Sequence, residues 1–179
     1  MSAEALKHSE ESQICREFQC MNTLSEVFNM ADTTLSSLAS RFEIIELTAR
    51  YSYLLDTNQI DSLLDLWSDD DPTFDIEEFG LGKAIGKDQI RNYLEVAIYG
   101  QNENLCHLAA NHVINEISES KASGTCHVLA LADVRAGGTS QATAYYTDQY
   151  VHENGMWKFS ARKVKPLTVP AAGNFQLPR

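Results

Sequence analysis

The sequence contains no long apolar run. A membrane-spanning helix needs about 20 consecutive, mostly apolar residues, and no stretch of the chain approaches that length. The N-terminal residues mix acidic, basic and small side chains, and they lack the basic start and apolar core of a secretory signal. We therefore expect a cytoplasmic protein.

Positive charge is also scarce. The chain carries 14 Lys and Arg residues against 25 Asp and Glu residues, a formal net charge of -11. Such a surface repels the phosphate backbone of nucleic acids and the anionic face of a membrane. We expect neither nucleic acid nor a membrane as a partner.

The usual cofactor and metal motifs are missing. No glycine-rich phosphate loop, G-x-S-x-G turn or C-x-x-C pair occurs, so we expect no bound cofactor and reduced thiols. One metal arrangement stays open, because His107 with Cys126 or His127, plus Asp56, would supply three ligands. Their spacing matches no structural zinc pattern, and we expect no metal.

What the sequence does contain is enough apolar material for one core. Of 179 residues, 44% are hydrophobic, which suits a single domain. Small polar residues after Ala31 separate an N-terminal extension, residues 1–34, from a main domain over residues 35–167. The extension is either helical or disordered, and residues 168–179 form a proline-containing tail.

Hydrophobic spacing predicts three helices before a run of strands. Leu38, Phe42, Ile45 and Ala49 form an apolar stripe along a helix over 35–55, and Ile44, Leu47 and Tyr51 widen it. Shorter helices are expected over 60–67 and 87–99, with a strand between them at 73–77.

Four further strands follow, joined by turn signals at Gly137-Gly138 and Asn154-Gly155. They are expected over residues 106–117, 125–135, 141–152 and 156–164. Helices packed on one side of an antiparallel sheet make an α+β layer architecture, and the space between such layers is a common place for small ligands.

Six short motifs lie within this order of elements. They are Tyr51-Ser-Tyr-Leu-Leu-Asp56, Leu63-Leu-Asp-Leu-Trp67, Gly86-Lys-Asp-Gln-Ile90, His107-Leu-Ala-Ala-Asn111, Tyr146-Thr-Asp-Gln-Tyr150 and Asn154-Gly-Met-Trp-Lys-Phe159. From about Leu38 to Leu167 the chain resembles the SnoaL-like branch of the nuclear-transport-factor-2-like superfamily. The resemblance implies a cone-shaped barrel, in which a strongly bent, mostly antiparallel sheet wraps around helices.

Within that superfamily the chain looks most like the group of dehydrochlorinases, scytalone dehydratases and bile-acid dehydratases. Asp56 and His107 match this group's Asp at the end of the first helix and its His after the third helix. Tyr51 matches a catalytic Tyr of the bile-acid enzymes. The dehydrochlorinases have a functional Arg near the last hairpin, where this chain reads His152-Glu153-Asn154, so we do not expect identical chemistry.

These positions suggest proton abstraction from carbon. An imidazole is a suitable base near neutral pH, and a carboxylate bonded to its other nitrogen fixes the tautomer. We assign His107 as base and Asp56 as its orienting partner, with Tyr51 or Tyr53 donating a hydrogen bond to the substrate. The alternative is structural, with Asp56 capping the next helix and His107 partly exposed.

Three further residues are candidates for binding substrate. Asn111 shares the strand alternation of His107, although a structural Asn is an equal alternative. Tyr146 and Asp148 share one face of their strand. If that face points inward, Asp148 is a buried carboxylate, but a solvated Asp148 is the expectation from residue type.

The predicted function is a cofactor-independent lyase, a dehydratase or related enzyme, acting on a small, largely apolar organic molecule. The alternatives are an isomerase or cyclase of a polyketide, steroid or terpenoid intermediate, and a non-catalytic ligand-binding or assembly module. The resemblance also implies a homo-oligomer, with a trimer favoured over a dimer.

Overall fold

The computed structural model describes residues 35–167, so the predicted extension and tail lie outside the described residues. The chain divides into two compact units, residues 1–39 and 40–179. Of the first unit only residues 35–39 are described, and they are helical.

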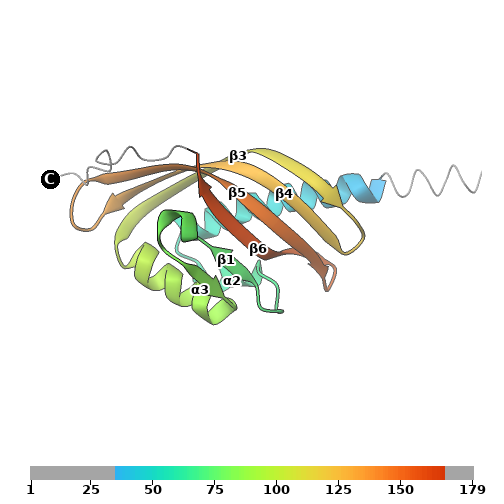
Figure 1. Cartoon of the computed structure of the whole chain (residues 1–179), viewed down its shortest axis with the longest axis horizontal. Coiled ribbons are helices and arrows are strands. Elements are labelled where there is room, and N and C mark those ends of the chain that lie inside the picture. The colour runs from blue at the N-terminus through green and yellow to red at the C-terminus, as the bar shows by residue number, and fades with distance from the viewer. Residues whose placement is uncertain (1–34, 168–179) are drawn as a thin grey trace, which may run out of the picture. The chain divides into compact units, whose positions relative to one another are not determined.

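A six-stranded sheet dominates this unit, in the order β2-β1-β6-β5-β4-β3. The strands are β1 (Thr73–Asp75), β2 (Lys83–Ile85), β3 (Asn102–Ile117), β4 (Lys121–Val134), β5 (Thr139–Glu153) and β6 (Met156–Pro166). All pairs are antiparallel except β1 with β6. The sheet curls strongly (Figure 1), which confirms the predicted α+β class, but it stays open rather than closing into a barrel.

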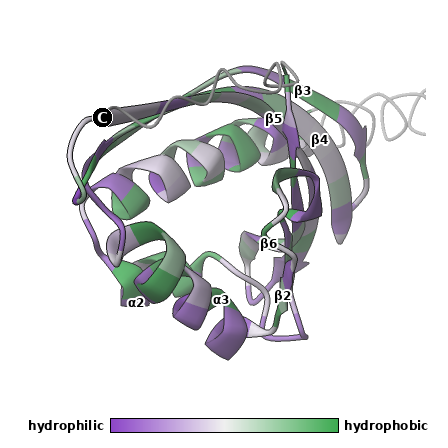
Figure 2. Ribbon diagram, turned by 60° about the vertical axis from the view of Figure 1, so that its left-hand side comes forward, coloured by the Kyte–Doolittle hydropathy of each residue, from purple (hydrophilic) through white to green (hydrophobic). Residues whose placement is uncertain are grey.

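Helices lie on the concave side of the sheet (Figure 2). They are the long helix (residues 40–56), α2 (Ile60–Asp65) and α3 (Lys87–Tyr93), which continues as a π-helical turn over Leu94–Tyr99. A short 3₁₀ turn, Glu77–Phe79, links β1 to β2, a strand that the sequence pattern did not predict. No helix among the described residues is long and apolar enough to cross a membrane.

The long helix buries a different stripe from the one predicted. Ile44, Leu47, Tyr51 and Leu55 face the core at helical spacing, whereas Phe42 is 72% exposed. The prediction of Phe42 and its neighbours as the main apolar stripe is therefore wrong. Two apolar stripes compete on this helix, and packing against the sheet selects the one that includes Tyr51.

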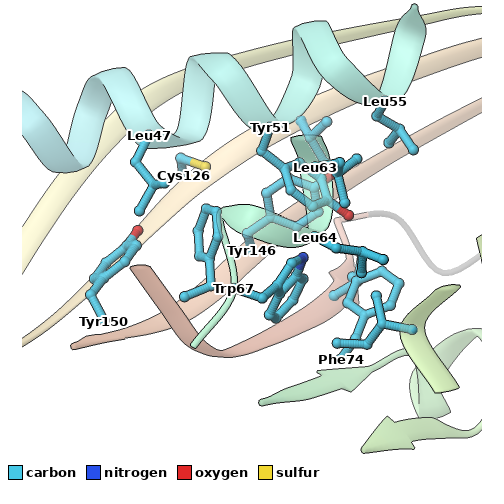
Figure 3. Packing of buried hydrophobic residues seen from close by; sticks show 14 of the residues in the cluster. Leu47, Tyr51, Leu55, Leu63, Leu64, Trp67, Phe74, Cys126, Tyr146 and Tyr150 are labelled. Atoms are coloured by element: carbon cyan, nitrogen blue, oxygen red, sulfur yellow. The ribbon is translucent and has the colours of Figure 1, made fainter. Parts of the chain in front are cut away.

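Aromatic side chains fill the core where the long helix crosses the sheet (Figure 3). The ring of Tyr51 meets Phe159 edge-on at a centroid distance of 5.6 Å and Trp67 at 6.2 Å. Such edge-to-face pairs add stabilisation beyond the burial of their surface. This packing fixes the helix against the sheet and so fixes the position of its C-terminal end.

Candidate active site

Asp56 and His107 lie in direct contact. Asp56 is the last residue of the long helix, and its Oδ1 is 2.6 Å from Nδ1 of His107 on β3. The backbone N–H of His107 donates to the other carboxylate oxygen, Oδ2, at 2.7 Å. Because both oxygens are held by a single residue, the carboxylate has a fixed orientation toward the imidazole.

This contact defines which ring nitrogen is free. A carboxylate accepts hydrogen bonds, so it favours a proton on Nδ1 and leaves the lone pair on Nε2. The side chains of His107 and Asp56 are only 12% and 21% exposed. The arrangement is that of an oriented base in a partly desolvated site.

The local sequence explains why the helix ends at Asp56. Asn58 adopts a left-handed conformation with φ of 54°, and its N–H donates to the carbonyl of Leu55 at 3.3 Å. The N–H of Gln59 donates to the carbonyl of Leu54 at 2.9 Å. This pair of bonds is a Schellman motif, which Asn tolerates better than most residues. No side-chain cap is formed at the start of α2, so Asp56 does not cap the next helix.

His107 borders two adjoining cavities. The inner cavity has a volume of about 180 Å³, and the polar side chains among its described lining residues are Tyr51, Tyr93, Tyr146 and His107. The outer cavity, of about 390 Å³, shares His107 with the inner one and also includes several amide side chains. The imidazole therefore stands where an apolar space meets a more polar one.

The tyrosines near the dyad are neutral hydrogen-bond donors at neutral pH. Burial raises the pKa of Tyr51 and of Tyr146, and it raises the pKa of Tyr93 to about 12. Burial likewise raises the pKa of Tyr99 to about 12, and its hydroxyl donates to the carbonyl of Leu55 at 2.7 Å. Tyr99 thus braces the helix end beside Asp56.

A buried ion pair lies behind Tyr51 and Tyr146. Arg162 donates through Nε and Nη2 to both oxygens of Asp148, at 2.8 and 2.7 Å, and neither side chain is exposed. The guanidinium carbon is 3.9 Å from the ring centroid of Tyr146 and 4.3 Å from that of Tyr51. The expectation of a solvated Asp148 is wrong, because its partner on β6 compensates the buried charge.

Two predicted residues lie away from both cavities. Tyr53 is 63% exposed and lines neither cavity. Asn111 is exposed, with φ of 56°, and its Nδ2 is 3.1 Å from Nδ1 of His127. The alternation that placed it on the face of His107 is interrupted, because β3 contains a bulge between Ala110 and Val113.

The possible metal ligands are likewise separated. His127 is exposed on the outer face, whereas Cys126 is buried on the inner one, and burial raises the pKa of its thiol to about 11. Within residues 35–167, no group of three or more His, Cys, Asp or Glu side chains is arranged to hold a metal ion.

Sequence reasoning missed Tyr93, Tyr99 and Arg162. An uninterrupted hairpin from the Asn154-Gly155 turn would place Ala161 opposite Asp148. A bulge at Ser160 on β6, opposite Gln149 and Tyr150, shifts the register by one residue and brings Arg162 there instead. The available signal was that Asp148 lies two positions from Tyr146 and from Tyr150 on the same strand.

The curled open sheet, the helices on its concave side and the His–Asp contact beside an apolar cavity define a small α+β domain with a pocket between its layers. The family model of the SnoaL-like domain matches residues 36–163, and the chain belongs to this family. The predicted resemblance is confirmed.

Named relatives agree with this assignment. The gamma-hexachlorocyclohexane dehydrochlorinase of Sphingobium indicum is 30% identical over 129 residues, covering 72% of this chain and 81% of the relative. The structure of hexachlorocyclohexane dehydrochlorinase LinA-type3 from Novosphingobium barchaimii matches with a TM-score of 0.68 and 26% identity, covering 81% of this chain and 99% of that one. A provisionally assigned scytalone dehydratase from Novosphingobium aromaticivorans matches with a TM-score of 0.67 and 25% identity, covering 82% and 99%.

Proposed function

We propose that this protein is a cofactor-independent lyase that eliminates water or another small leaving group from a small, largely apolar organic substrate. The observation that carries the proposal is the Asp56–His107 contact at the border of the apolar inner cavity. The names of the relatives support it, because dehydrochlorination and dehydration are both eliminations.

In the proposed reaction, Nε2 of His107 removes a proton from a carbon atom of the substrate. The electron pair of the broken C–H bond forms a double bond to the neighbouring carbon, and the leaving group departs with its own bonding pair. Asp56 stabilises the imidazolium that forms. A leaving hydroxyl takes up the proton carried by the His107 imidazolium and departs as water, which restores the neutral base.

Tyr51 is the proposed hydrogen-bond donor in this site. It lines the inner cavity, and its raised pKa keeps the hydroxyl protonated at neutral pH. A donor in a water-poor cavity stabilises developing negative charge more strongly than it would in water. The hydroxyl would contact a carbonyl or the leaving group, with Tyr146 shaping the same wall.

An isomerisation or cyclisation would begin with the same proton transfer, so the test must follow the product as well as the proton. We would incubate the protein in D₂O with gamma-hexachlorocyclohexane and with 3-hydroxycyclohexanone. NMR would report C–H exchange, and mass spectrometry would report loss of HCl or water. An elimination loses the leaving group, whereas an isomerisation keeps every heavy atom and changes the mass only by exchanged deuterium.

Variants connect any activity to the dyad. We expect His107→Ala and Asp56→Asn to lower kcat/KM by about 10²–10⁴-fold, the usual contribution of an oriented general base. Tyr53→Phe is the matched control, because Tyr53 is exposed on the same helix. The proposal is wrong if activity survives in His107→Ala, and a binding module gains support if wild type never exceeds that variant on either probe.

We also propose a homotrimer, which the exposed apolar residues Leu108 and Val113 on the outer face of β3 support. Sedimentation equilibrium would give three times the chain mass. Leu108→Glu should shift the protein toward monomer if this face is the interface.

A further inference from the structure

The inner face of the sheet is covered by small residues around His107. His107 pairs with Ala130 on β4, and Ala130 pairs with Ala142 on β5, so these three residues form one row across the sheet. The flanking rows on this face include Ala109, Val128 and Ala144 on one side, and Ala132 and Ser140 on the other. We call Ala130, Ala142 and Ala144 the alanine floor. Because these side chains are short, the sheet and the helices leave a hollow between them.

The hollow has the size of a single ring. The inner cavity measures about 180 Å³. An engineered apolar cavity of about 150 Å³ in another protein binds benzene, so this one accommodates one six-membered ring with little space to spare. The hollow adjoins the outer cavity, so a second fused ring would have to extend out of it past His107.

The outer cavity offers a different chemistry. It shares His107, Ala130 and Ala142 with the inner cavity, and it adds the amide residues Gln101 and Asn102. The Nδ2 of Asn102 already donates to the carbonyl of Ile98 at 2.9 Å, which holds this side chain in place. The outer cavity therefore suits a hydrogen-bonding group.

We infer that the substrate has two parts: one apolar six-membered ring on the alanine floor, and a polar hydrogen-bonding group in the outer cavity. Ala130 and Ala142 set the size limit for the ring, and the reacting C–H lies at the junction, opposite His107. The position of the reacting bond rests on the proposed function. The size limit does not, because it follows from the cavity alone.

The first test measures binding of benzyl alcohol to the full chain by NMR titration, with 2-naphthylmethanol as the two-ring probe. We expect benzyl alcohol to bind at least about tenfold more tightly than 2-naphthylmethanol, because the second ring does not fit the hollow. Equal or tighter binding of the two-ring probe would overturn the size limit.

Substitutions in the alanine floor give a graded version of this test. Ala142→Val and Ala142→Leu should weaken benzyl alcohol binding progressively, by about tenfold or more for Leu, without lowering the Tm, because the added carbons fill empty space. Ala110→Leu is the matched control, since Ala110 is exposed on the opposite face. The inference fails if Ala142→Leu binds the probe as wild type does.

The second test addresses the polar part, with N-benzylacetamide as a probe that carries the same ring and an amide. Gln101→Leu should weaken its binding by about fivefold, the loss of one hydrogen bond, and leave benzyl alcohol unaffected. Equal effects on both probes, or none, would overturn the two-part assignment.

Both tests should give the same result in Asp56→Asn, which keeps every residue that lines the two cavities and removes the carboxylate that orients the base. If ring binding follows the floor variants but no elimination is found, the inference stands and the proposed reaction fails. If elimination depends on His107 but Ala142→Leu does not weaken ring binding, the proposed reaction stands and the inference fails.

Discussion

The two ends of the sheet's inner face share strands but differ in what they carry. At one end, large side chains from β5 and β6, including Tyr146, Tyr150, Phe159 and Arg162, pack into a filled core. At the other end, Ala130, Ala142 and Ala144 leave a hollow beside His107. The difference in side-chain size accounts for a filled core at one end of the inner face and a cavity at the other.

The filled end tolerates the Arg162 charge because the Asp148 carboxylate opposes it and accepts two of its hydrogen bonds. Arg162 and Asp148 have no exposed surface, and Tyr150 donates a further hydrogen bond to Asp148 at 3.0 Å. Three aromatic rings surround the guanidinium, since Phe159 also lies 4.2 Å from it. A pair of this kind stabilises a fold only while both partners are present.

The largest expected effect comes from breaking that pair. Asp148→Asn leaves the Arg162 charge buried without a counter-charge, and we expect a loss of about 3–5 kcal/mol in the free energy of unfolding, measured with urea. Asp61→Asn is the control, because its ion pair with Arg91 is exposed and should contribute far less to the free energy of unfolding. Similar losses in the two variants would show that Asp148 does not compensate the buried charge of Arg162.

Adding carbon atoms at each end sharpens the comparison. A Cβ on Gly124, beside the filled end, would lie 2.9 Å from the carbonyl oxygen of Val113 and 3.4 Å from the Tyr150 ring. We expect Gly124→Ala to cost about 1–3 kcal/mol, the usual effect of overpacking. Ala144→Val adds carbon to the hollow and should change stability by less than about 1 kcal/mol in the same urea experiment. A larger loss for Ala144→Val would contradict the contrast.

A smaller effect is expected where the hollow end meets the long helix. Asn58→Val places a β-branched residue in the left-handed conformation after Asp56 and should cost about 1–2 kcal/mol. Asn58→Gly removes the strain and should preserve stability. Ring ¹⁵N spectra of His107 would show whether the Nδ1–H tautomer is lost in the Val variant; an unchanged tautomer would mean that this helix end does not orient the dyad.

The smallest effect concerns Cys126, which belongs to the filled end. With Cys15, Cys20 and Cys106 replaced by Ser, native Cys126 should barely react with iodoacetamide at pH 8. Its pKa of about 11 leaves only about one thiol in a thousand ionised at that pH, because the neutral form is favoured below the pKa. Labelling should accelerate as pH approaches 11 or when urea is added. Rapid labelling at pH 8 would show that this end opens readily.

The sequence allowed the order of elements to be predicted, because hydrophobic spacing and turn residues are local signals. The short strand β2 lacked such a signal. The buried face of the long helix was assigned to the wrong stripe, since both stripes have helical spacing and only contact with the sheet distinguishes them.

The candidate site was only partly predictable from the sequence. Asp56 and His107 came from a family resemblance, and the structure places them in contact. Arg162 and the true orientation of Asn111 depend on bulges in β5–β6 and β3, which shift register and reverse alternation. Such irregularities are set by long-range packing, so strand periodicity alone did not reveal them.

The irregular course of β3 affects how readily copies of this protein aggregate at high concentration. Among the described strands β3 forms one edge of the sheet, with three breaks in its pairing to β4 and left-handed residues at Asn104 and Asn111. An intact edge strand is a template on which another chain can add by hydrogen bonding and begin a fibril. The breaks twist and interrupt that template, so β3 resists strand-by-strand aggregation.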